Sequence, residues 1–144
     1  MAPSTSLEIN SELQNGISKS DVLCRIITPV GMLGYGFEEC QLIAALEDSK
    51  TLAVPIALIL DSGSTDSGPS KLALGSMTCP RSSYERDLGK LIPLAIKYEV
   101  PILISSAGGD GSDEHVDTFL EIIRELADKP ANKYEIHLSI YRIL

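Results

Sequence analysis

Four short apolar runs recur along the chain, and three of them end in loops crowded with glycine, serine and aspartate. They predict strands near residues 22–28, 56–61, 101–105 and 134–141. The first three are nearly continuous in apolar residues, whereas the fourth alternates apolar and polar positions. Continuous apolar runs of this length, bounded by glycine, are typical of strands buried in a parallel sheet.

Between these runs, apolar residues recur at three- and four-residue steps, which predicts helices over 38–47, 82–97 and 116–127. Pro93 falls inside the second of them and predicts a kink or a break. The alternation of strand and helix predicts an α/β fold of the three-layer, Rossmann-like kind, with a parallel sheet of about four strands. Residues 61–81 are too many for a plain connection, so we expect a functional loop there.

The two ends of the sequence differ from the middle. Residues 1–20 are rich in serine and asparagine, and we expect a flexible tail before a single α/β domain over 21–144. The chain stops at the end of the fourth predicted strand, as if truncated after it. An uncovered edge strand needs protection, so we expect a homo-oligomer or a separate chain that supplies a missing C-terminal part.

Charge and composition exclude several functions. Twenty acidic against twelve basic residues give a net charge of −8, and no basic patch is present, so we expect no nucleic-acid partner. No apolar run is long enough to span a membrane, and no secretory signal begins the chain, which favours a cytoplasmic protein. The three cysteines lack CxxC spacing, and we expect Cys24 and Cys40 to be small core residues.

The carboxyl ends of parallel strands meet at one edge of the sheet, where ligands usually bind. The loop after the first strand carries Gly31, Gly34 and Gly36 and precedes a helix. Backbone amides in such a loop can hold a phosphate or a carboxylate. The alternative is that these glycines only permit a tight turn.

The loop after the second strand carries two carboxylates and several hydroxyls. Asp61 stands at the strand end, Asp66 follows five residues later, and Ser64 and Thr65 lie between them. Oxygen ligands of this kind suit a divalent cation such as Mg²⁺, and both aspartates are candidate catalytic residues. Alternatively, Asp61 binds a ribose hydroxyl, or only ties its own loop through backbone amides.

The loop after the third strand combines hydroxyls, glycines and a histidine. Ser105 and Ser106 could bind a substrate oxygen, and Gly108 and Gly109 could bring the backbone close to a ligand. His115 is a candidate for acid–base catalysis, although it could equally be an exposed residue in the first turn of a helix. The same stretch also carries Asp110, Asp113, Glu114 and Asp117.

Four segments of these loops resemble a known family. They are RIITPVGMLGYGF at 25–37, DSGSTDSGP at 61–69, RDL at 86–88 and ISSAGG at 104–109. In this order and spacing they resemble the N-terminal part of the acyclic terpene utilisation (AtuA-like) family, over about residues 22–141. Chains of that family continue further, and residues 49–55 depart from its pattern.

The resemblance implies an enzyme, or half of one, acting on a small organic acid or acyl-CoA in a branched-acid, terpenoid or secondary-metabolite pathway. Lyase, hydratase or isomerase chemistry fits the acidic residues, hydroxyls and single histidine of the loops better than hydride transfer does, since no dinucleotide fingerprint is present. The alternative is a shortened, non-catalytic protein that binds a ligand or a partner through the same loops.

Overall fold

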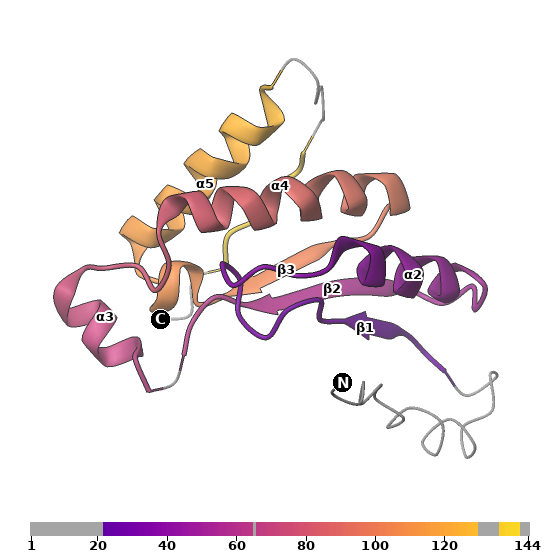
Figure 1. Cartoon of the computed structure of the whole chain (residues 1–144), viewed down its shortest axis with the longest axis horizontal. Helices are drawn as coiled ribbons and strands as arrows, with labels where there is room; N and C mark the ends of the chain where they lie inside the picture. Colours follow the sequence, from indigo (N-terminus) through magenta and orange to yellow (C-terminus); the bar gives the residue numbers. More distant parts are fainter. Residues whose placement is uncertain (1–21, 65, 130–135, 142–144) are drawn as a thin grey trace, which may run out of the picture.

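A computed structural model describes residues 22–64, 66–129 and 136–141 and shows strands alternating with helices (Figure 1). The elements run in the order β1 (Arg25–Ile27), α2 (Glu39–Lys50), β2 (Ile56–Asp61), α3 (Gly68–Leu74), α4 (Arg81–Tyr98), β3 (Ile102–Ser105), the 3₁₀ turn η2 (Ala107–Gly109) and α5 (Asp113–Ala127). The predicted α/β class is confirmed. The predicted flexible tail over residues 1–20 lies outside the described residues.

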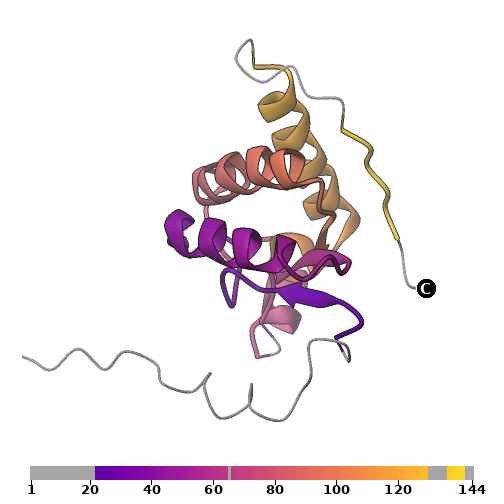
Figure 2. The ribbon, with the colours of Figure 1, turned by 90° about the vertical axis from the view of Figure 1, so that its right-hand side faces the viewer.

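The three strands form one parallel sheet in the order β1-β2-β3. Ile27 of β1 lies opposite Leu58 of β2, which in turn lies opposite Ile102 of β3. Since consecutive strands are neighbours, connections of one hand all fall on the same face of the sheet. Figure 2 shows this arrangement, with α2, α4 and α5 on one side of the strands.

The core fills the space between this face and the helices. Tyr84 and Phe119 join α4 to α5 through rings whose centroids are 4.8 Å apart. The fully buried members come from every layer: Leu33, Leu46, Leu58, Leu60, Tyr84, Leu88, Leu91 and Ile122. Apolar burial of this kind is the main favourable contribution to the free energy of folding.

The opposite face of the sheet carries apolar side chains that the described residues leave open. Ile26 of β1 is 61% exposed and Leu103 of β3 is 51% exposed, and their strand positions share one face. The described part of the chain therefore has two layers, and the predicted third layer is not confirmed. Cys24 and Cys40 are exposed, so the prediction that they belong to the core is wrong.

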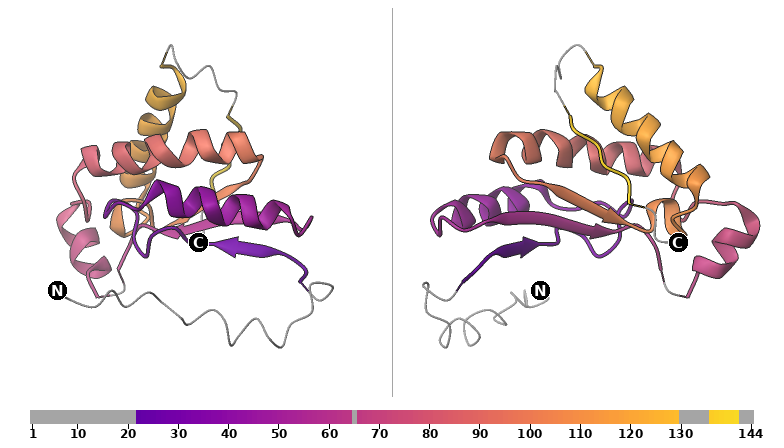
Figure 3. Two further views of the ribbon diagram at one scale, coloured as in Figure 1. Left: turned by 45° about the vertical axis from the view of Figure 1, so that its right-hand side comes forward. Right: turned by 180° about the vertical axis from the view of Figure 1, so that it is seen from behind.

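The fourth predicted strand is not confirmed either. Residues 134 and 135 lie outside the described part, and residues 136–141 have no regular secondary structure. This segment passes beside β3 and α5 (Figure 3), where Ile136 packs against the core. Leu138 and Ile140 remain nearly half exposed, because without a ladder partner the segment does not turn one face fully inward.

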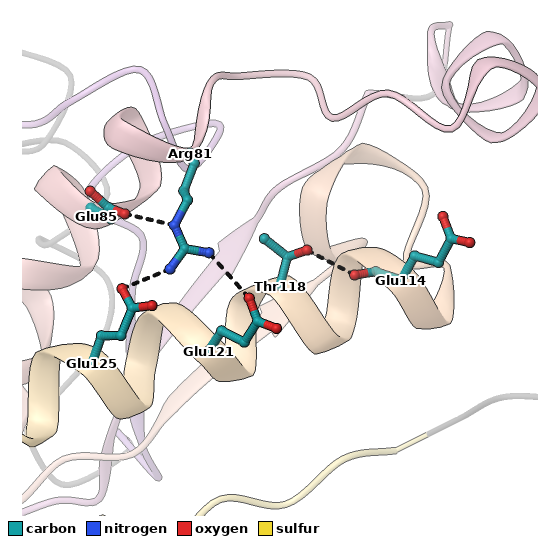
Figure 4. A network of polar contacts seen from close by, with 6 residues as sticks. All are labelled: Arg81, Glu85, Glu114, Thr118, Glu121 and Glu125. Atoms are coloured by element: carbon teal, nitrogen blue, oxygen red, sulfur yellow. Dashed lines mark hydrogen bonds and ion pairs between the residues drawn. The ribbon is translucent and has the colours of Figure 1, made fainter.

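Helix α4 runs unbroken past Pro93, so the predicted break is not found. Its first residue, Arg81, ties it to α5 (Figure 4). The guanidinium binds Glu85 at 2.8 Å within α4, and reaches Glu121 at 3.4 Å and Glu125 at 2.7 Å on α5. Exposed pairs of this kind contribute little to stability, but this network fixes how the two helices lie together.

Candidate functional site

The loops that follow the three strands meet at one edge of the sheet. Asp61 at the end of β2 pairs in register with Ser105 at the end of β3, and Ser62 N–H donates to the Ser105 carbonyl at 3.0 Å. From the loop after β1, Leu33 N–H donates to the Asp61 carbonyl at 2.8 Å. Parallel strands impose this arrangement, since their carboxyl ends all point the same way.

Asp61 carries a fixed carboxylate at this edge. Its Oδ1 accepts hydrogen bonds from Gly63 N–H at 3.0 Å and from the Ser105 hydroxyl at 2.9 Å. Partial burial raises the pKa of Asp61, but the bonds from Gly63, Ser105 and their neighbours outweigh it, so the pKa lies below its ordinary value. Asp61 is therefore ionised at neutral pH.

A hollow of about 400 Å³ opens beside Asp61. It is lined by Asp61, Gly63, Ser64, Gly68, Pro69, Leu72, Ser106, Gly109 and Asp110. The charged side chains of this lining, among the residues that the structure describes, are both acidic. The hollow therefore favours a hydroxyl group, another hydrogen-bond donor or a cation over a bare anion.

Asp110 joins this hollow to the histidine behind it. Its Oδ1 lies 2.7 Å from His115 Nδ1 and accepts the Ser112 N–H at 2.8 Å. The Asp110 side chain is only 3% exposed and that of His115 only 6%. Burial raises the pKa of Asp110, but the hydrogen bonds to Ser112 and His115 lower it by more. The pKa therefore lies below its ordinary value, and the carboxylate is ionised at neutral pH. His115 is thus a buried partner of Asp110, not an exposed first-turn residue.

Three backbone positions bring these groups together. Ser106 adopts a left-handed conformation, with φ of 50°, between β3 and η2, which is uncommon for a residue with a side chain. A Cβ on Gly63 would stand 2.6 Å from Ser106 Cβ, and a Cβ on Gly108 would stand 2.6 Å from that of His115. Only glycine permits both approaches, and strain of this kind is common at functional sites.

The first glycine loop is held by the protein itself. Asp87 on α4 is fully buried, and its Oδ2 accepts Gly34 N–H at 2.8 Å and Gly36 N–H at 3.0 Å. Its Oδ1 accepts Arg86 Nε at 2.8 Å. These two amides therefore bind a carboxylate of the chain itself, whereas the sequence predicts a phosphate or carboxylate of a ligand there. Gly31 is exposed at the outer part of the loop.

The other predicted residues are only partly brought together. Ser64 lines the hollow, whereas Asp66 is exposed and is not part of the lining. Thr65 lies outside the described residues. Within the described ranges, no group of three or more histidine, cysteine, aspartate or glutamate side chains could hold a metal ion. The second carboxylate of the hollow is that of Asp110. Its position in a glycine loop, five residues before His115, is the sequence signal that could have indicated it.

The chain matched no protein-family model, no curated protein and no solved structure. Its function is therefore inferred from the geometry of the site and from the loop motifs described above.

The arrangement suits proton transfer and the binding of a polar group. The residues that line the hollow include two aspartates, Asp61 and Asp110, and two serines, Ser64 and Ser106. A hydrogen bond between His115 Nδ1 and Asp110 Oδ1 holds the Asp110 carboxylate in place.

Proposed function

We propose that this chain is an AtuA-like enzyme of the lyase, hydratase or isomerase type, acting on a small organic acid or acyl-CoA in a branched-acid, terpenoid or secondary-metabolite pathway. One observation carries the proposal: the buried Asp110–His115 pair, whose carboxylate lines the same hollow as Asp61. Acid–base catalysis needs such a pair, held in place by its neighbours and within reach of a ligand.

In this proposal Asp61 and Ser106 hold a hydroxyl or carbonyl oxygen of the substrate. Asp110 exchanges a proton with the substrate, and His115 holds Asp110 in place. Because the pKa of Asp110 is lowered, its carboxylate is ionised at neutral pH and can accept a proton, and the hydrogen bond to His115 fixes its position. His115 keeps its predicted part in the chemistry, but acts through Asp110.

The acidic lining also orients the substrate. A carboxylate or a CoA phosphate entering the hollow would meet two ionised aspartates, whose like charge repels it. The hydroxyl or carbonyl group of the substrate therefore enters, and its acidic end lies outside.

A cytoplasmic location agrees with substrates of this kind. No described helix is long and apolar enough to cross a membrane.

A non-catalytic binding protein is the second candidate. The exposed apolar face that carries Ile26 and Leu103 favours it, because such a face is usually covered by a partner. A second chain, or a second copy, would then be the main ligand of this protein. The two candidates differ in whether the Asp110–His115 pair moves protons.

The test is hydrogen exchange on a substrate in D₂O. The protein is incubated with 3-hydroxy-3-methylbutyryl-CoA and with 3-hydroxybutyryl-CoA. Deuterium entry next to the thioester is followed by NMR, and the conjugated enoyl thioester by ultraviolet absorbance. We expect Asp110→Asn and His115→Gln each to lower the rate by about a hundredfold or more. His137→Gln, at an exposed histidine outside the hollow, is the matched control and keeps the wild-type rate. Absence of exchange with both substrates favours the binding protein.

A further inference from the structure

One polar atom of the site has no hydrogen-bond partner among the residues that the structure describes. Both contacts of Asp110 described above involve Oδ1, whereas its Oδ2 is buried and makes no hydrogen bond to the described residues. Leaving a buried, ionised oxygen unpaired is costly, and buried polar atoms nearly always have a partner. A partner from outside the described residues is therefore expected at Asp110 Oδ2.

The other groups around the hollow narrow the chemistry of that partner. Asp61 supplies a second ionised carboxylate, and Ser64 and Ser106 supply neutral hydroxyls. No lysine, arginine, histidine or cysteine belongs to this lining, so far as the structure describes it. A set of oxygen ligands with two negative charges suits a hard divalent cation, whereas zinc prefers histidine and cysteine.

We propose that the hollow binds one hard divalent cation, Mg²⁺ or Mn²⁺, between Asp61 and Asp110. This inference rests on the proposed function in that it assigns the cation to the same hollow; with the cation bound, Asp110 would hold it through Oδ2 and would not itself exchange a proton with the substrate. Two carboxylates fill only part of an octahedral shell, so the serine hydroxyls and water complete it, as is usual for Mg²⁺. The carboxylate pair differs from the Asp61–Asp66 pair that the sequence predicts, because Asp66 lies outside the lining.

A cation at this position changes what the hollow accepts. Without it, two aspartates repel the acidic end of an organic acid; with it, their charge is neutralised and a carboxylate or thioester oxygen can approach. The left-handed turn at Ser106 and the close approach of Gly63 fit this role, because they bring the Ser106 hydroxyl and the Gly109 carbonyl oxygen close together beside Gly63.

The test uses Mn²⁺ alone, without any substrate. The electron paramagnetic resonance signal of free Mn²⁺ is followed as the protein is added. We expect one site per chain, from which excess Mg²⁺ displaces Mn²⁺. Asp61→Asn and Asp110→Asn should each weaken binding by at least about tenfold, the lower limit for disturbing even an outer neighbour of a metal site. Asp117→Asn, at an exposed aspartate on α5, keeps the wild-type affinity.

Four outcomes would overturn the inference. Wild-type protein that leaves the Mn²⁺ signal unchanged would mean that water satisfies Asp110 Oδ2. Binding lost in Asp66→Asn but kept in Asp110→Asn would return the site to the Asp61–Asp66 pair. Binding lost equally in Asp117→Asn would mean non-specific attraction.

Circular dichroism checks the fold of each variant. If Asp110→Asn unfolds, Asp61→Asn, at an exposed residue, still tests the inference. Exchange activity that persists in EDTA would refute the cation alone and leave the proposed function standing.

Discussion

At the scale of single residues, two buried carboxylates serve different purposes. Asp87 uses both oxygens within the chain, and so fixes the glycine loop after β1. Asp110 uses only Oδ1 in its hydrogen bonds to the described residues, and its buried Oδ2 has no partner among them. A buried polar atom without a partner needs an explanation, and the proposed cation supplies one.

Replacing Asp87 should therefore destabilise the fold. In Asp87→Asn the side chain keeps one acceptor oxygen but loses its charge, so its bonds to Gly34, Gly36 and Arg86 weaken. We expect the free energy of unfolding, measured by urea titration, to fall by about 1–3 kcal/mol. Asp117→Asn should change it by less than about 0.5 kcal/mol. An equal effect of the two variants would show that the loop does not depend on Asp87.

The lowered pKa values of Asp61 and Asp110 predict how stability depends on pH. Each folded pKa lies below the unfolded value of about 3.9, so each carboxylate stabilises the protein above about pH 4. That contribution is lost as the pH falls through the folded pKa values. We expect the melting temperature to drop more steeply on acidification in the wild type than in the Asp61→Asn/Asp110→Asn double variant. Parallel curves would contradict the lowered pKa values.

The roles of these residues could be predicted from the sequence only in part. The candidate residues Asp61, Ser64 and Ser106 line one hollow because each follows a strand or stands beside its end. The sequence indicates only that Asp87 is an acidic residue in the first turns of a helix. Its role could not be predicted, because its partners Gly34 and Gly36 lie more than fifty residues away in the sequence. Contacts over such distances leave no local pattern.

At the scale of elements, apolar runs predicted the three observed strands, since buried parallel strands need continuous apolar residues. The alternation of apolar and polar residues was not enough to predict residues 136–141 correctly. In the described part of the chain, this segment does not pair with a neighbouring strand. The 3₁₀ turn after β3 was also missed, because it depends on the left-handed backbone of Ser106, which its neighbours impose.

The end of α4 offers a prediction at this scale. Glu99 closes the helix with φ of 56°, and its N–H and that of Val100 both bind the Ala95 carbonyl. Glycine adopts this conformation without the steric cost that a side chain adds, so Glu99→Gly should raise the free energy of unfolding by about 0.5–1 kcal/mol. Lys97→Gly, inside the last turn, should lower it by about 1 kcal/mol. Urea titration compares the two, and a loss in both would exclude the left-handed cap.

At the scale of the whole molecule, the described residues leave one apolar face of the sheet open. We expect it to drive self-association, because Ile26 and Leu103 are large, apolar and exposed on the same side of the sheet. Light scattering after size-exclusion chromatography should show a lower average mass for the Ile26→Lys/Leu103→Lys double variant than for the wild type. Leu74→Lys, at an exposed leucine on α3, should leave the mass unchanged. A monomeric wild type at high concentration would refute the expectation.

The strand order β1-β2-β3 also bears on how the protein is made. On the ribosome, residues appear from the N-terminus, and each strand of this sheet finds its neighbour already present when it emerges. β2 can dock on β1 as soon as α2 and β2 are synthesised, and β3 can then dock on β2. No strand has to wait for its neighbour to be synthesised later. Pairing between elements close in sequence also shortens the search for the native state. The sheet can therefore grow one strand at a time, in the direction of translation.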